Sequence, residues 1–126
     1  KVHQFNVFSA NHPIQAALAD FMADASQYLE LPAFYQQKRD YFLQAMSSTR
    51  FRPLKSEGAY FQLFDYSDIS DEADRDFCKR LTTDFGVAAI PVSAFYSDGR
   101  DDKVIRLCFA KTEDLLGEAG RRLEGV

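Results

Sequence analysis

Cysteine, histidine and tryptophan are scarce in this chain of 126 residues, which contains two cysteines, two histidines and no tryptophan. Cys78 and Cys108 stand far apart, each beside apolar residues. This pattern is typical of reduced core thiols in a cytoplasmic protein rather than of a disulfide or metal framework. His3 and His12 lack metal-ligand spacing and have no acidic partner within a helical turn. We therefore expect no metal site and interpret both histidines as exposed or capping residues.

An excess of positive charge and a long apolar run are also absent. Lysine and arginine number 15 against 19 acidic residues, which gives a net charge of −4 and a pI near 5.1. Without a basic stripe to neutralise phosphates, we expect no nucleic-acid partner and no anionic membrane surface. The longest apolar run, residues 87–92, contains Pro91 and is far shorter than the roughly 20 residues of a membrane-spanning helix.

Large apolar side chains are present in the number that a folded domain needs. The chain has 12 phenylalanines and 6 tyrosines, and 46% of its residues are hydrophobic, so it can bury a core of ordinary size. We find no internal repeat, low-complexity tract or linker. The chain begins at Lys1 with neither methionine nor an apolar stretch behind basic residues. We expect no secretory signal and interpret this start as a cut in a longer protein.

Apolar periodicity divides the chain into helices followed by mixed strands and helices. The first twelve residues show no helical phase, and Asn11 and Pro13 then predict a helix start. A second amphipathic helix follows Pro32. Alternation predicts strands at 59–66, 87–96 and 104–110, with a short extended piece at 51–55. Ser70 and Asp71 can cap a helix that Gly86 ends, and Thr112 can cap the last helix.

This order predicts an α+β fold, a two-layer sandwich in which a small sheet of three or four strands carries helices packed on one face. The strand, helix and strand between residues 59 and 96 are compatible with a right-handed crossover to a parallel neighbouring strand.

Arg106 is the most informative single residue because it lies in the middle of an apolar strand. Alternation places it on one sheet face with Cys108, while Ile105 and Leu107 point to the other face. A guanidinium keeps its charge and needs a carboxylate, a phosphate or water, and its planar fork fits a carboxylate with two hydrogen bonds. Two interpretations of Arg106 remain: it is half-solvated or paired with an acidic residue inside the protein, or it binds a ligand.

Few other residues point to chemistry. The segment 91–96 ends an apolar stretch at a polar loop, where binding residues are common, but core aromatics at a strand end explain it equally well. No phosphate-binding glycine loop or nucleophile elbow occurs. The six lysines stand on helix faces, chain ends or turns, so we interpret them as solvated.

Five blocks of sequence together resemble the carboxy-terminal third of class I and II aminotransferases that depend on pyridoxal 5'-phosphate (PLP), and the methionine and kynurenine aminotransferases among them most. The similarity runs over nearly the whole chain in the family's order. The blocks are VHQFNVFS at 2–9, FYQQKRD at 34–40, SEGAYF at 56–61, GVAAIPVSAFY at 86–96 and IRLCFA at 105–110.

The resemblance implies roles for two residues and a division of the chain. Arg106 matches the family's arginine that binds the substrate α-carboxylate. Phe8 occupies the place of an aromatic that reaches the neighbouring subunit's active site, which implies a homodimer. Residues 1–30 would be the end of the cofactor domain and its linking helix, and residues 31–126 the small carboxy-terminal domain. Segments 58–61 and 91–96 resemble parts that border the substrate pocket, with no residue of defined role.

The resemblance also shows what the chain lacks. The family's Schiff-base lysine and other PLP-binding residues precede the matched region, so no cofactor-binding or catalytic residue is assigned here. The implied function is part of a cytoplasmic PLP-dependent aminotransferase. It would transfer an amino group from an amino acid (methionine, aromatic or glutamine-like) to a 2-oxo acid, and the fragment alone would be inactive. The alternatives are a non-catalytic module that binds a carboxylate, and an interaction domain.

Overall fold

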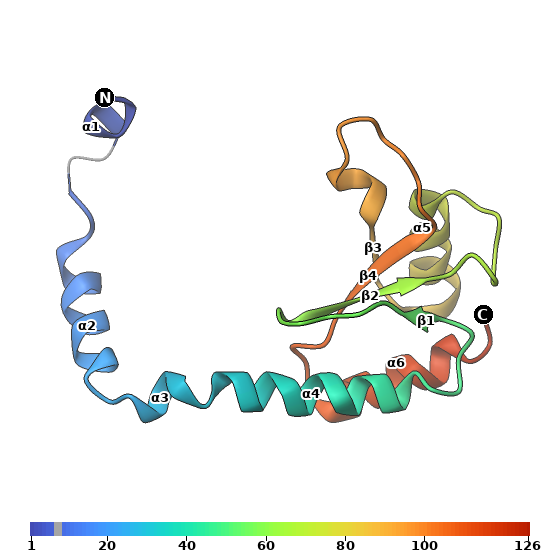
Figure 1. Cartoon of the computed structure of the whole chain (residues 1–126), viewed down its shortest axis with the longest axis horizontal. Coiled ribbons are helices and arrows are strands. Elements are labelled where there is room, and N and C mark those ends of the chain that lie inside the picture. Colours follow the sequence, from blue (N-terminus) through green and yellow to red (C-terminus); the bar gives the residue numbers. More distant parts are fainter. Residues whose placement is uncertain (7–8) are drawn as a thin grey trace. The chain divides into compact units, whose positions relative to one another are not determined.

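A computed structural model describes residues 1–6 and 9–126 of the chain and divides it into two compact units, residues 1–34 and 35–126. The first unit contains helices α1 (Val2–Asn6), α2 (His12–Met22) and α3 (Ser26–Leu29) (Figure 1). The helix α1 differs from the expectation of no helical phase in this region. As predicted, Asn11 caps α2: its side-chain oxygen accepts a hydrogen bond of 3.2 Å from the Ile14 N–H. No described residue from 1 to 34 is buried.

The second unit is built on a four-stranded sheet in the order β1-β2-β4-β3. Its strands are β1 (Arg52–Pro53), β2 (Phe61–Asp65), β3 (Ile90–Pro91) and β4 (Val104–Cys108), and every neighbouring pair is antiparallel. The suggested parallel neighbour is therefore wrong. The strands β2 and β3 both pair with β4, which lies between them. The helix that follows β2 and precedes β3 in the sequence therefore does not link adjacent strands.

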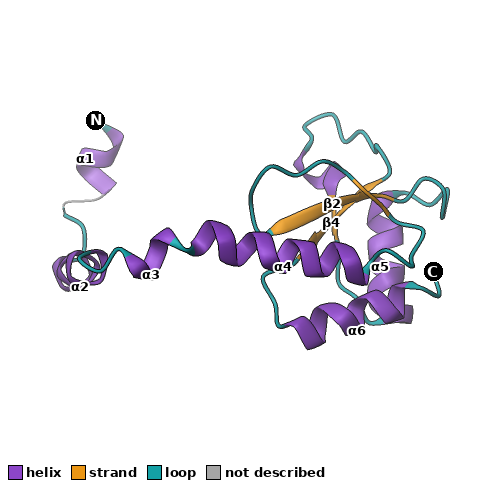
Figure 2. Cartoon of the chain, turned by 60° about the horizontal axis from the view of Figure 1, so that its bottom comes forward, coloured by secondary structure: helices purple, strands orange, loops and turns teal. Residues whose placement is uncertain are grey.

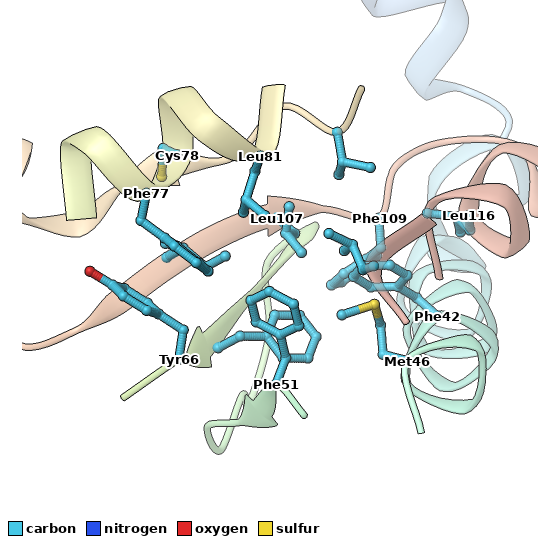
Figure 3. Packing of buried hydrophobic residues seen from close by; sticks show 14 residues of the cluster. Phe42, Met46, Phe51, Tyr66, Phe77, Cys78, Leu81, Leu107, Phe109 and Leu116 are labelled. Atoms are coloured by element: carbon cyan, nitrogen blue, oxygen red, sulfur yellow. The ribbon is translucent and has the colours of Figure 1, made fainter. Parts of the chain in front are cut away.

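Three helices cover one face of this sheet and close the core against it (Figures 2 and 3). They are α4 (Leu31–Ala45), α5 (Asp74–Phe85) and α6 (Glu113–Leu123). Alternate residues of the strands point into this core, as Phe64, Ile105 and Leu107 do. The predicted α+β two-layer fold, with helices on one face of a small sheet, is confirmed. The buried hydrophobic residues that these helices contribute are Phe42, Phe77, Cys78, Leu81, Leu116 and Leu123.

Glycines occupy two positions where the backbone demands them. Gly86 ends α5, as predicted, in the left-handed conformation with φ of 66°, and the Val87 N–H bonds the Leu81 carbonyl oxygen. Gly120 of α6 faces the end of α4, where a Cβ atom would lie 3.0 Å from the carbonyl carbon of Ala45. The helices α4 and α6 consequently lie side by side at very short range (Figure 2).

The predicted strand at 87–96 is mostly wrong. It pairs only at Ile90–Pro91 and continues as a single 3-10 turn, η1 (Val92–Phe95). The cause is that Pro91 has no N–H to give to the sheet, while the N–H of Ser93 is taken by the carboxylate of Asp74.

Two predicted helix caps also differ from the structure. The residue before α5 is Ala73, since the Ser70 hydroxyl accepts a hydrogen bond from the Glu72 N–H in a turn ahead of the helix. Thr112 does precede α6, but its side chain makes no capping hydrogen bond.

The two thiols are free and lie in different environments. Cys78 is buried in the core, as predicted, whereas Cys108 is exposed, which corrects its interpretation as a core thiol. Cys108 lies at the end of β4, where strand alternation turns its side chain away from the core. Within the described ranges, no helix has the length and apolar character that a membrane crossing requires.

Candidate functional site

Arg106 lies at the centre of β4, on the sheet face opposite to α4, α5 and α6. Its strand neighbours are Leu63 of β2 and Ile90 of β3. The side chains before and after it, Ile105 and Leu107, are buried in the core, so strand alternation points Arg106 to the opposite face. The predicted placement of Arg106 is confirmed.

Two aromatic rings flank the guanidinium of Arg106. Its Cζ atom lies 4.6 Å from the ring centroid of Phe61 and 5.2 Å from that of Phe95. Phe61 is half-buried on β2, and Phe95 is 61% exposed at the end of η1. A cation beside such rings gains about 0.5–2 kcal/mol depending on its desolvation. The rings therefore orient the guanidinium and leave its N–H donors available.

No acidic side chain neutralises this guanidinium within residues 1–6 and 9–126. The ion pairs there involve other arginines and lysines, and no side-chain hydrogen bond includes Arg106. The internally paired reading of Arg106 therefore has no support in the described part of the chain. A half-buried guanidinium with its donors unused, on an open sheet face, suits an external carboxylate bound through two N–H groups.

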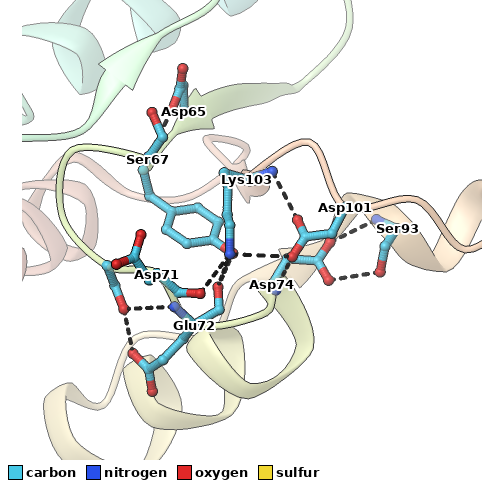
Figure 4. A network of polar contacts seen from close by, with 10 residues as sticks. Asp65, Ser67, Asp71, Glu72, Asp74, Ser93, Asp101 and Lys103 are labelled. Atoms are coloured by element: carbon cyan, nitrogen blue, oxygen red, sulfur yellow. Dashed lines mark hydrogen bonds and ion pairs between the residues drawn. The ribbon is translucent and has the colours of Figure 1, made fainter.

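The turn that carries Phe95 is anchored to α5 by a buried carboxylate (Figure 4). Asp74, only 2% exposed, accepts a 2.7 Å hydrogen bond from the Ser93 N–H through Oδ2. Its Oδ1 accepts a second bond, also 2.7 Å, from the Ser93 hydroxyl. The N–H of Asp74 in turn donates to Oδ2 of Asp101 over 2.9 Å. These bonds connect the start of α5, η1 and the loop before β4.

Lys103 and Tyr66 complete this polar cluster. Lys103 Nζ pairs with Asp101 at 3.8 Å and donates to the backbone oxygens of Asp71 and Glu72. Burial, with the negative charges of Asp101 and Asp74, raises the pKa of the Tyr66 hydroxyl. That hydroxyl stays protonated and donates to the Glu72 carbonyl oxygen over 2.9 Å. The cluster is a structural support at the edge of the Arg106 site.

The sequence predicted the position of Arg106 but gave no role to the residues around it. Phe61 and Phe95 lie in the segments 58–61 and 91–96, for which no residue role was predicted. The register of β2 against β4 could have placed Phe61 beside Arg106, since alternation puts both on one face. The position of Phe95 and the role of Asp74 depend on the 3-10 turn, which the pattern of residues did not predict. The predicted residue Phe8 lies outside the described residues.

A cavity of about 280 Å³ lies away from Arg106, between β4 and the helices. Lys111 reaches it but is exposed, and the nearby carboxylate of Glu118 is held by Arg121 and Arg122. The other residues that line it include Phe42, Val87, Leu107 and Leu115.

The described residues do not fit a PLP site. Such a site needs a lysine amine inside a pocket and a free carboxylate for the pyridine nitrogen. Lys38 donates to the Lys111 carbonyl oxygen, Lys55 pairs with Glu57, and Lys103 is bound in the polar cluster. No step that involves PLP can be derived from these residues.

Comparison with known proteins gives a consistent result. A family model for aminotransferase class I and II matches residues 1–123. The chain is 51% identical over 124 residues to methionine aminotransferase of Escherichia coli (strain K12), which covers 98% of this chain and 32% of that protein. It is 31% identical over 144 residues to human kynurenine–oxoglutarate transaminase 1, which covers 97% of this chain and 34% of the relative.

Solved structures agree in fold as well as in sequence. The structure of an Escherichia coli protein with methionine aminotransferase function superposes with a TM-score of 0.92 at 49% identity, over 99% of this chain and 33% of that one. N-succinyldiaminopimelate aminotransferase of Mycobacterium tuberculosis gives a TM-score of 0.81 at 32% identity, over 97% and 32%. The chain thus spans about a third of the length of the relatives that it matches.

Proposed function

Because the chain belongs to the class I and II aminotransferase family, which matches residues 1–123, we propose that it forms the small domain of a PLP-dependent aminotransferase in which Arg106 binds the substrate carboxylate. The substrates would be an amino acid (methionine, aromatic or glutamine-like) and a 2-oxo acid. The names of the relatives, methionine aminotransferase and kynurenine–oxoglutarate transaminase, support methionine and an aromatic amino acid as substrates and a 2-oxo acid as the acceptor. Both substrate types carry the α-carboxylate that one arginine can bind.

The observation that carries the proposal is the guanidinium of Arg106 between two aromatic rings with no acidic partner in the described part of the chain. Binding of a substrate carboxylate would give a physical reason for the charge at the centre of this apolar strand. A carboxylate bound through two parallel N–H groups is held in a fixed plane and not merely attracted. Fixing that plane orients the α-carbon of the substrate, which is the atom where transamination takes place.

The residues of this chain would supply substrate binding, and the rest of the enzyme would supply PLP and the lysine that holds it. PLP, when bound, supplies the stabilisation of negative charge at the α-carbon, and the lysine that holds it would lie outside this chain. Arg106 binds and orients the carboxylate, and the rings of Phe61 and Phe95 pack against its guanidinium. The isolated chain should therefore have no transaminase activity.

We extend the proposal to the domain organisation. Residues 1–30 would form the end of the cofactor domain and the linking helix, and residues 31–126 the small domain. Residues 1–34 support this assignment, because Phe5, Phe21 and Leu29 are exposed by 84%, 50% and 67%. Apolar surface of this extent is typical of a segment that packs on other parts of a larger protein.

The proposed whole enzyme is a cytoplasmic homodimer. Phe8 would reach the active site of the neighbouring subunit, in keeping with the apolar character of the first segment. The presence of two free thiols, Cys78 and Cys108, is typical of a reducing compartment.

The test uses the full-length enzyme and its Arg106→Ala variant. We expect the variant to keep the absorbance of bound PLP and to lose kcat/KM for methionine at least about 100-fold, since the loss of a desolvated charge partner costs about 3–5 kcal/mol. The matched control is Arg100→Ala. Arg100 also lies over an aromatic ring, Tyr96 at 4.3 Å, but is solvent-exposed and paired with Asp102.

The outcomes separate the proposal from its rivals. Wild-type turnover that falls only in the Arg106 variant supports the assignment. Turnover that Arg106→Ala leaves near normal contradicts the role of Arg106. A full-length protein that binds carboxylates but never transaminates would favour the non-catalytic binding module. Loss of assembly without loss of ligand binding in a Phe8→Ala variant would favour the interaction domain.

A further inference from the structure

We propose that Asp74 is a positioning residue for recognition of the substrate carboxylate. It acts through Ser93 and η1 on the position of the Phe95 ring beside Arg106. This inference rests on the proposed function of Arg106 and adds a residue that touches neither substrate nor cofactor. The chain of contacts runs from the first residue of α5 to Ser93, from there to Phe95 two residues later, and from Phe95 to Arg106.

Two hydrogen bonds join Asp74 to Ser93, and we call this pair of bonds the clasp. Both carboxylate oxygens are used, one by the backbone N–H and one by the hydroxyl of Ser93, and each bond is 2.7 Å long. Both residues are buried, with exposures of 2% and 5%. Charge-assisted hydrogen bonds are about twice as strong as neutral ones, and low exposure keeps water from replacing them. The clasp therefore fixes both the backbone and the side chain of Ser93.

Within the described residues, the clasp supplies the side-chain hydrogen bonds that hold η1, which otherwise only packs against β4 and α5. The turn comprises four residues, and the strand before it, Ile90–Pro91, has only two. Ser93 is its one buried residue, whereas Phe95 is 61% exposed. Without the clasp, Phe95 would lose its fixed position relative to the guanidinium 5.2 Å away. Phe61 alone would then flank Arg106, and the direction of the guanidinium fork would be less defined.

Asp74 is itself held from a second side. Its N–H donates to Oδ2 of Asp101, and Oδ1 of Asp101 accepts the Lys103 N–H over 2.8 Å. Lys103 directly precedes β4, the strand that carries Arg106. The clasp and the strand of Arg106 are thus parts of one hydrogen-bonded frame, so a shift of η1 relative to Arg106 requires that these bonds break.

The first experiment measures binding in the full-length enzyme by calorimetry. The probes are 4-(methylsulfanyl)butanoate, which is methionine without its amino group, and its primary amide, which lacks the charge. The ratio of the two dissociation constants reports the contribution of the guanidinium fork. We expect Asp74→Asn to weaken carboxylate binding about tenfold, well below the ~100-fold that a misplacement of 1 Å can cost, and to leave amide binding within about twofold.

The variants are chosen so that each result is decisive. Ser93→Ala removes only the hydroxyl and keeps the backbone bond, so it should lower the carboxylate-to-amide ratio by less than Asp74→Asn does. It also serves as the second variant if Asp74→Asn does not fold. Asp76→Asn is the matched control, because Asp76 lies in the same first turn of α5, loses the same charge and is exposed.

The ratio of the dissociation constants of the carboxylate and the amide distinguishes a positioning role of Asp74 from a merely structural one. General destabilisation reduces the fraction of active protein but leaves the ratio of dissociation constants and the KM unchanged. An unchanged ratio in both Asp74→Asn and Ser93→Ala would overturn the inference. The binding data test it even if the wild-type enzyme shows no turnover, a result that would instead overturn the proposed function. In an active enzyme, we expect Asp74→Asn to raise KM for methionine about tenfold with a smaller change in kcat.

Discussion

Substitution of Gly120 by alanine tests the close approach of α4 and α6 on which the helical layer depends. An added Cβ would lie 3.0 Å from the carbonyl carbon of Ala45 and 3.3 Å from its Cβ, and closer still to its carbonyl oxygen. These atoms belong to the helix backbone and to a short side chain, so they cannot rotate away. The two helices would have to move apart, and the core beneath them would lose contact.

The expected magnitude follows from two opposing effects. Overpacking of a tight site costs about 1–3 kcal/mol, whereas replacing glycine by alanine inside a helix gains about 1 kcal/mol. We expect Gly120→Ala to lower the free energy of unfolding by up to about 2 kcal/mol, as the net of the two effects. The Cβ of Gly117→Ala, the control one turn earlier, would lie 3.1 Å from the Tyr41 hydroxyl and 3.8 Å from Nη1 of Arg121, in ordinary contact with the latter. That hydroxyl is the far end of a movable side chain, so the control should be neutral or stabilised.

The assay is urea unfolding of the chain followed by circular dichroism. With slopes of about 1–3 kcal/mol per molar, Gly120→Ala should have a midpoint lower than that of Gly117→Ala by roughly 1 M. Equal midpoints for the two variants, with equal slopes, would show that α4 and α6 do not approach as closely as described.

Two further predictions concern titratable groups. At neutral pH a thiol reagent should modify exposed Cys108 and spare Cys78, because burial raises the pKa of the Cys78 thiol to about 12; equal rates in the folded chain would contradict this. Hydrogen bonds from Arg80 and Ser70 hold the pKa of Glu72 below its usual 4.5. The resulting stability is present above that pH and is lost as the pH falls through the lowered pKa. A Glu72→Gln variant should therefore lose less stability than the wild type on acid titration followed by fluorescence, and parallel titration curves would refute the assignment.

Alternation in the sequence was enough to place Arg106, since a strand with period two has only two faces and Ile105 and Leu107 had to be buried. The same reasoning failed for residues 87–96. There, apolar content indicated a strand, but the buried carboxylate of Asp74 captures the N–H that a strand would use. A contact between residues 19 positions apart leaves no trace in a local pattern.

The parts of the site that the sequence did not predict depend on similar side-chain contacts. Phe95 flanks Arg106 only because η1 bends at Ser93, and the helix start moved to Asp74 because Ser70 uses its hydroxyl in a preceding turn. In each case a side chain competes with regular backbone hydrogen bonding. Local periodicity predicts the elements that obey it, and such competition is common where a fold supports a functional group.

The most direct test of the central claim is a crystal structure of the full-length enzyme with 4-(methylsulfanyl)butanoate bound. We expect the ligand carboxylate to accept two hydrogen bonds of roughly 2.7–2.9 Å from the guanidinium of Arg106, with Phe61 and Phe95 beside that guanidinium. A carboxylate bound elsewhere, with Arg106 paired to an acidic side chain of the enzyme itself, would contradict it.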